Sequence, residues 1–355
     1  MAVLCQLANP EHYRPFDWSL VADPADLAYW LGLFAGFPRR IEKLLRADGL
    51  AGADFESRWR AFCEEYAAGM ARWQADPLAG GEVTTIALCE FRQAMLIKHG
   101  FPDPYAGIKA RENEAAAELY PGVIERIDRL PAEQRWETLL RALFAGNMFD
   151  MGSPLTIDLY HTGGIDFLAT LDRIPPRPWF IDHADALHER LWPKPAWRQI
   201  LFFVDNAGSD IVLGAIPVIR ELARRGPRVV VAANTTPALN DITIDELNVL
   251  LRRLAEVDPV LAGLLEDGRI ATVASGCGIP LIDLSRVSDE CNAAAAQSDL
   301  IVLEGMGRGV ESNWRQTFKC DVWRVALLKD ESVVKWVGAH LWDPVCRFDP
   351  APTAH

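Results

Sequence analysis

One stretch of the chain, residues 199–246, limits the possible fold more than any other. The apolar run Ile200–Val204 has the length of a buried strand. Ile211–Arg225 follows with apolar residues at helical spacing, and Pro217 predicts a kink inside that helix. Val229–Ala233 has the pattern of a second buried strand. Strands joined through a helix pair in parallel with a right-handed crossover, so the stretch predicts an α/β fold.

The segments on either side of this unit complete the prediction. Helical patterns precede it at residues 25–45, 51–74, 83–98 and 139–145, and a Pro- and Trp-rich stretch at 174–197 predicts an irregular connection. Further strands are predicted at 270–274, 300–303, 325–328 and 345–348, with helices at 242–257 and 333–338. We therefore expect a helical N-terminal part, residues 1–190, and a Rossmann-like, mostly parallel sheet in residues 191–355.

Polar residues follow the first two strands of this unit. Asp205 and Asn206 come after the first strand, and Asp241 follows the second. Parallel strands end at one edge of the sheet, and two carboxylates with an amide oxygen suit a hard cation. Gly208 and Ser209 stand where the next helix begins, and N–H groups at a helix start attract phosphate. The alternative is that these residues only end strands and begin turns.

The other predicted strands also end in polar residues. The strand-end side chains are Asn234, Ser275, Glu304, Arg308 and Lys329, all expected at the same sheet edge. The helical part adds a second group: Lys109, Arg111, Asn113, Asn147 and Asp150. This second group either covers the pocket and contacts substrate, or serves in packing and helix capping. The sequence leaves both interpretations open.

Composition narrows the function. A net charge of −13 disfavours nucleic acid, whose binding requires that phosphates be neutralised. No apolar run is long enough to cross a bilayer, so no membrane association is predicted. The seven cysteines are scattered without a paired motif, which favours the reducing cytoplasm. Nothing in the sequence sets an oligomeric state.

Rival motifs do not match. Residues 305–310 resemble a dinucleotide fingerprint, but Val310 replaces its third glycine. A haloacid-dehalogenase phosphatase would carry an acid where this chain has Ala207. A methyltransferase on a Rossmann-like sheet is an alternative function, but it predicts a glycine-rich loop after the first strand, and residues 205–208 contain one glycine.

Four blocks of the chain follow a known pattern: VDNAGSDIVLGAIPVIREL, AANTTPALNDIT, LIDLSRVS and LEGMGRGVESN. They resemble the metal-dependent damage-control phosphatases, first catalogued as domain-of-unknown-function family 89. Blocks that begin at Phe101, Phe144 and Arg177 resemble the branch with stand-alone plant proteins and the phosphatase domain fused to pantothenate kinase 4. No kinase domain precedes the resemblance in this sequence, so we expect an activity not physically tied to coenzyme A synthesis.

The resemblance implies a divalent metal held by Asp205, Asn206 and Asp241, either Mg²⁺ or Mn²⁺, with Co²⁺ or Ni²⁺ as alternatives. It implies hydrolysis of small phosphate monoesters, and 4′-phosphopantetheine or its oxidised forms are the substrates of this branch. Sugar phosphates, used in other branches, are the alternative. Lys329 matches the family's lysine after the late strand, although the fuller Arg-Thr-x-Lys pattern is absent.

These residues suggest a mechanism. A bound metal would polarise the phosphoryl oxygens and acidify a water, Lys329 and Arg308 would offset charge on those oxygens, and Asp205 would be a ligand or a general base. Lys109 or Arg111 would meet the added charge of an oxidised sulfur. Two facing carboxylates without a cation repel each other, so we expect Asp241→Ala to leave the melting temperature of the apoprotein unchanged or higher.

Overall fold

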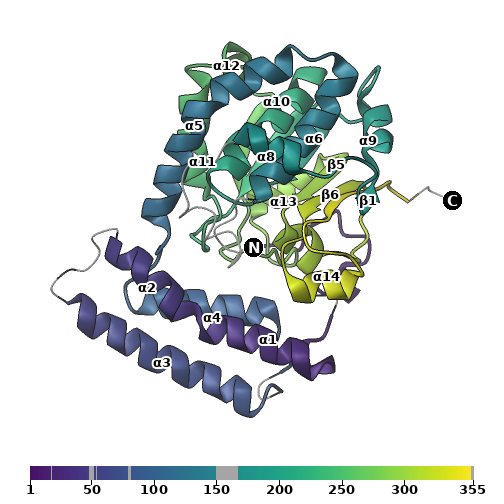
Figure 1. The fold of residues 1–355 in the computed structure, drawn as a ribbon. Coiled ribbons are helices and arrows are strands. Elements are labelled where there is room, and N and C mark those ends of the chain that lie inside the picture. The colour runs from purple at the N-terminus through teal and green to yellow at the C-terminus, as the bar shows by residue number, and fades with distance from the viewer. Residues whose placement is uncertain (17, 48–51, 53, 79–80, 149–166, 353–355) are drawn as a thin grey trace.

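A sheet of seven strands forms the centre of the protein, seen in a computed structural model (Figure 1). The structure describes residues 1–355 apart from 17, 48–51, 53, 79–80, 149–166 and 353–355. The strand order is β1-β7-β6-β5-β2-β3-β4, and the neighbouring pairs are parallel except β6 with β7. The strands are β1 Ile181–Asp182, β2 Gln199–Phe203, β3 Arg228–Ala233, β4 Ile270–Ala274, β5 Leu300–Glu304, β6 Asp321–Leu327 and β7 Pro344–Asp349. The predicted α/β class and mostly parallel sheet are confirmed.

The central strand β2 shows why the sheet is buried on both faces. Its five residues are all buried. Ile200 and Phe202 belong to a core shared with the long helices, whereas Leu201 and Phe203 join a second core on the other face. Successive side chains of a strand point to opposite faces, so a continuous apolar run is what a doubly covered strand requires.

Helices cover the two faces unequally. The first face carries α5 Ala106–Asp128, α6 Ala132–Met148, α8 Phe167–Arg173, α9 Ala184–Leu191, the π-helical turn η3 Asp210–Ala215, α10 Ile216–Arg225, α11 Ile244–Ala255 and α12 Pro259–Glu266. The second face is covered by α13 Asp289–Ala296 and by N-terminal residues that include Leu4 and Leu7. Within the described residues, no helix combines the length and the apolar character needed to cross a membrane.

A separate layer of helices packs at the carboxyl edge of the sheet, next to α14 Glu331–Val337 (Figure 1). It consists of α1 Pro24–Ala35, α2 Phe37–Ala47, α3 Phe55–Ala75 and α4 Thr85–Lys98. The single helix predicted at 25–45 is wrong, because the chain breaks at Gly36 between α1 and α2. Pro38 has no N–H to donate to the carbonyl of Phe34. That carbonyl accepts the Tyr66 hydroxyl at 3.0 Å instead.

One further prediction needs correction, and the structure adds detail to another. The connection at 174–197 contains β1 and α9, because two residues there pair with β7 and because Asp182 is held by Arg177 at 2.8 Å. Such a short strand leaves no sequence pattern. Pro217 lies in the first turn of α10, directly after the π-helical turn η3, so the helix predicted at 211–225 changes from π-helical to α-helical geometry just before the proline.

Candidate active site

A cavity lies between the carboxyl edge of the sheet and the N-terminal helices. Its sheet side is lined by residues from the loops after β2, β3, β4, β5 and β6, including Asp205, Asn206, Asp241 and Lys329. Strands β3 and β5 flank β2 on opposite sides, so the strand order reverses there. Open α/β sheets bind ligands at such a reversal.

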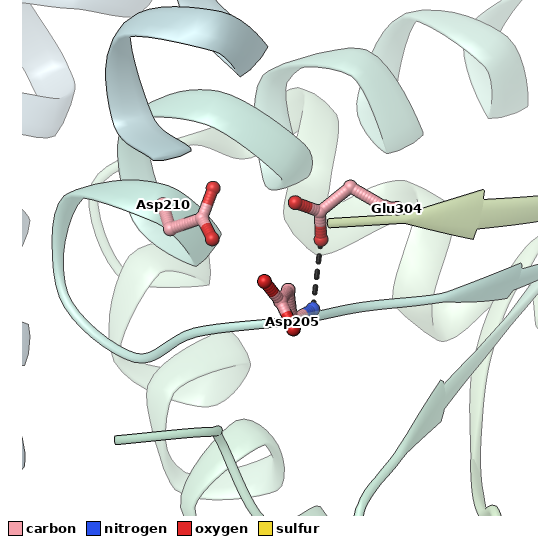
Figure 2. Close-up of side chains that lie close together, drawn as sticks. All are labelled: Asp205, Asp210 and Glu304. Atoms are coloured by element: carbon pink, nitrogen blue, oxygen red, sulfur yellow. Dashed lines mark hydrogen bonds between the residues drawn. The ribbon is translucent and has the colours of Figure 1, made fainter. Parts of the chain in front are cut away.

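Three buried carboxylates converge at this edge. One carboxylate oxygen from each of Asp205, Asp210 and Glu304 lies within 4.8 Å of the others (Figure 2). The backbone N–H of Asp205 donates to Glu304 Oε2 at 2.7 Å. Burial raises the pKa of Glu304 well above its ordinary value, and the charges of Asp210 and Asp205 raise it further, while Arg308 opposes them. The cluster therefore has the donor set of a divalent cation site: buried, oxygen-only and rich in negative charge.

Two amides hold the carboxylates in place. Asn206 Nδ2 donates to Asp205 Oδ2 and to Asp210 Oδ2, both at 2.8 Å. Asn147, at the end of α6, donates from Nδ2 to Asp210 Oδ2 at 3.0 Å and to Asp205 Oδ2 at 3.4 Å. Amide N–H groups that point at carboxylates favour the charged form. The two amides thus fix the orientation of the Asp205 and Asp210 carboxylates.

Arg308 lies between the two predicted acidic ligands. Its Nη1 pairs with Asp205, and its Nη2 donates to Asp241 Oδ2 at 2.6 Å and to Asn234 Oδ1 at 3.2 Å. Desolvation by itself would lower the pKa of Arg308, but the carboxylates of Asp241 and Asp205 outweigh it and raise the pKa. Arg308 is therefore an internal counter-ion, held by residues from the loops after β2 and β3.

The structure brings the predicted metal ligands together. Asn206 and Asp241 pair as an isolated β-bridge, and the N–H of Ile242 donates to the carbonyl of Asp205 at 3.0 Å. Asp241 Oδ2 also accepts the amide of Asn234 at 3.0 Å. Lys329 is buried after β6, lines the cavity and donates from Nζ to the carbonyl of Asn147 at 2.7 Å. The loops after β2, β3 and β6 therefore meet at one end of the cavity.

The predicted residues of α5 support this end from behind. Lys109 is fully buried, and its Nζ lies 3.0 Å from Asp103 Oδ2 and 2.9 Å from Glu246 Oε1. Asn113 Oδ1 accepts the N–H of Gly208 at 2.7 Å. Arg111 is exposed on α5. The carboxylate partners of Lys109 and the backbone partner of Asn113 favour the packing alternative for these two residues.

The remaining predicted residues lie around the cluster. Gly208 has a positive φ of 76°, and a Cβ there would approach Glu112 to 3.0 Å. Ser209 precedes η3 and is half-buried. The Ser275 hydroxyl accepts the N–H of Cys277 at 3.1 Å, within its own loop. Asp150 lies outside the described residues.

Sequence reasoning overlooked three residues. Asp210 completes the carboxylate cluster, and its signal was its position five residues after Asp205, at the start of the following helix. Arg40 on α2 and Arg92 on α4 line the opposite side of the cavity. No local pattern marks these two, because arginines at helical spacing are typical of solvated faces.

A comparison with known protein families decides the assignment. The model of the damage-control phosphatase ARMT1-like domain matches residues 37–343, most of the chain. The chain belongs to this family. The resemblance found in the sequence is therefore confirmed, and with it the prediction of a phosphatase.

Individual proteins similar to this chain support the same family assignment. The damage-control phosphatase At2g17340 of Arabidopsis thaliana is 37% identical over 95% of this chain and 92% of its own length. The 4′-phosphopantetheine phosphatase of Mus musculus is 28% identical, and the match covers 97% of this chain but 48% of the mouse protein. A DUF89-family crystal structure from Pyrococcus horikoshii has a TM-score of 0.64 at 20% identity, covering 90% of this chain and 96% of that one. The last similarity concerns the fold alone.

Proposed function

We propose that this phosphatase hydrolyses 4′-phosphopantetheine or its oxidised forms, with the phosphate bound at the Asp205 end of the cavity. The observation that carries the proposal is a cavity lined on its sheet side by Lys329 and by Asp205, one member of the buried carboxylate cluster, with an apolar, arginine-bearing wall opposite. Such a cavity suits a slim ester with a long tail better than a flat macromolecular surface. The name of the mouse relative agrees with this substrate.

We further propose that a divalent cation, Mg²⁺, Mn²⁺, Co²⁺ or Ni²⁺, binds at this end. The predicted ligands Asp205, Asn206 and Asp241 and the clustered carboxylates of Asp210 and Glu304 form an all-oxygen set that fits such an ion. When bound, the cation supplies polarisation of the phosphoryl oxygens and acidifies a coordinated water. It would also balance carboxylates that Arg308 by itself does not neutralise.

The chain's own groups supply the rest of the mechanism. Lys329 and Arg308 would place positive charge beside the phosphate oxygens, where negative charge increases as the ester bond breaks. Asp205 lines the cavity, where it would serve as a ligand of the cation or as the general base that accepts a proton from water. The N–H of Gly208 is directed to Asn113, so the helix start contributes rigidity of the loop more than phosphate donors.

The proposal also includes the type of sheet, the cellular compartment and the class of partner. We infer a Rossmann-like sheet from the reversal of strand order at β2. We place the protein in the cytoplasm, since all seven cysteines are free thiols. The net charge of −13 supports a small ester rather than nucleic acid as the partner.

A phosphate-release assay tests the proposed function. 4′-Phosphopantetheine, its sulfonate and fructose 1-phosphate are compared under one metal condition, and kcat/KM is measured for each. We expect the pantetheine esters to be preferred. A clear preference for the sugar phosphate would contradict the proposed substrate and favour the sugar-phosphatase alternative.

A further inference from the structure

The wall opposite the carboxylate cluster is built by the N-terminal helices. α1 contributes Trp30, Leu33 and Phe34, α2 contributes Arg40, and α4 contributes Thr85, Cys89 and Arg92. Most of these residues are apolar, so the two arginines are the cations of this wall. Their positions are far from the strand-end motifs in sequence, and neither has a role in the mechanism above.

Arg92 is buried against aromatic rings. It is 7% exposed, and its guanidinium lies 5.0 Å from the ring centres of both Phe34 and Phe37. Its Nη2 contacts Cys89 Sγ at 3.6 Å, and its Nε has no hydrogen-bond partner. Rings offset part of the cost of burying a cation, but they leave the N–H donors of the guanidinium fork unused.

Arg40 lies close enough to Arg92 to feel its charge. It is half-buried and donates from Nη2 to the carbonyl of Leu33 at 2.7 Å. Burial lowers the pKa of Arg40, and the positive charge of Arg92 lowers it further. Two like charges therefore face the same cavity from adjacent helices.

Acidic groups of the cavity do not neutralise this pair. Glu311 and Asp330 also line the cavity, and Asp330 accepts the Tyr29 hydroxyl at 2.6 Å. Across the part of the chain that the structure describes, no carboxylate oxygen lies within 4.0 Å of a guanidinium nitrogen of Arg40 or Arg92. Burying charge without an ionic partner is costly, which points to a ligand as the partner.

We infer that Arg40 and Arg92 form a subsite for an oxyanion at the end of the substrate opposite its phosphate. The inference rests on the proposed function, which places the phosphate beside Asp205. A guanidinium fork binds sulfonate, carboxylate or phosphate oxygens in pairs, and a buried site strengthens the contact. The subsite would make this phosphatase selective for esters that carry a second acidic group, such as an oxidised sulfur.

This assignment replaces the expectation for Lys109 and Arg111. Lys109 is already paired with Asp103 and Glu246, and Arg111 is exposed. Arg40 and Arg92, in contrast, line the cavity itself. The acidic group at the far end of the substrate would therefore bind to arginines of the N-terminal helices rather than to α5.

The test compares 4′-phosphopantetheine with its sulfonate in the full-length, metal-loaded protein. For Arg92→Gln and Arg40→Gln, we expect the sulfonate-to-thiol ratio of kcat/KM to fall about 10- to 100-fold, as loss of a charge-assisted hydrogen bond predicts. Arg92→Lys should recover part of the ratio. Arg58→Gln is the matched control, because Arg58 also lies over a ring, 4.9 Å from the centre of Phe101, but outside the cavity lining.

A ratio that Arg92→Gln and Arg40→Gln leave unchanged, or that Arg58→Gln lowers as much, would overturn the subsite. Binding of pantetheine sulfonate, which has no phosphate, is measured separately by calorimetry. We expect weaker binding in Arg40→Gln and Arg92→Gln than in the unmodified protein, and equal binding would also overturn the subsite. Absence of phosphate release from every ester would contradict the proposed function, while the calorimetry would still decide the subsite.

Discussion

The sheet side of the cavity buries acids, whereas the helical side carries Arg92, buried over aromatic rings, and the half-buried Arg40. Around Asp205, four carboxylates and two cations are buried: Asp205, Asp210, Asp241 and Glu304 with Arg308 and Lys329. On the other side, Arg92 and Arg40 face the cavity without a carboxylate within 4.0 Å among the described residues. One side therefore fits a cation and the other an anion.

This difference teaches how one cavity can hold both ends of a ligand. The two walls come from different kinds of structure: strand-end loops on the acidic side and helices on the other. The acids stand on strand-end loops that backbone hydrogen bonds lock in register, such as Ile242 to Asp205. The arginines stand on helices whose apolar side chains pack in one core with Leu281 and Leu328 of the strand-end loops.

Among the changes that separate the acidic side from the arginine side, removal of metal should have the largest effect on activity. We expect full loss of phosphatase activity after treatment with EDTA, because the carboxylates then lack the cation that polarises the phosphate. Addition of Mg²⁺, Mn²⁺, Co²⁺ or Ni²⁺ should restore turnover, measured as phosphate release. Undiminished turnover in a metal-free sample would show that the acidic side needs no cation.

Lys329→Met tests the cation on the acidic side. We expect kcat to fall about 100- to 1000-fold, because Lys329 would no longer offset charge on the phosphoryl oxygens. Lys335→Met is the control, since Lys335 lies on α14 nearby but is 57% exposed and pairs with Asp23 and Asp26. Equal kinetics of the two variants would remove Lys329 from the mechanism.

Asp241→Ala tests the internal counter-ion by stability. Arg308 would lose its partner at 2.6 Å, and breaking a buried ion pair costs about 3–5 kcal/mol. We therefore expect a lower melting temperature of the apoprotein, opposite to the expectation from repulsion alone. Asp185→Ala removes the partner of an exposed pair with Arg177, where a loss of about 0.2–1 kcal/mol is expected. Denaturant unfolding of both variants measures the difference, and an unchanged or higher stability of Asp241→Ala would restore the repulsion argument.

Gly208→Ala tests how tightly the loop that carries Asp205 and Asp210 is packed. Its φ of 76° costs a side chain about 1–2 kcal/mol. Gly338→Ala carries the same φ of 76° with no heavy atom within 4 Å of the added Cβ, whereas at Gly208 the Cβ meets Glu112. We expect Gly208→Ala to be less stable than Gly338→Ala in urea unfolding. Equal losses would mean that Glu112 yields and that only the backbone matters.

Much of the sheet was predictable from the sequence. The strands at 270–274 and 345–348 are present as expected, because apolar runs are local signals. The break at Gly36 was not predicted, since helical spacing continues across it and the effect of Pro38 was overlooked. The partners of Lys109 were also hidden, because Asp103 and Glu246 lie on different elements.

The sequence by itself determined the strand–helix–strand unit, the polar strand ends and the family, because each depends on residues that are neighbours in the chain. Only the tertiary structure decided which charges pair. Arg308 meets Asp241 across 67 positions and Arg92 meets the cavity from another layer, and such contacts depend on strand register and helix packing. Electrostatic energy depends on distance in space. Asp205 and Asp241 were expected to repel each other, but in the folded protein Arg308 pairs with both of them.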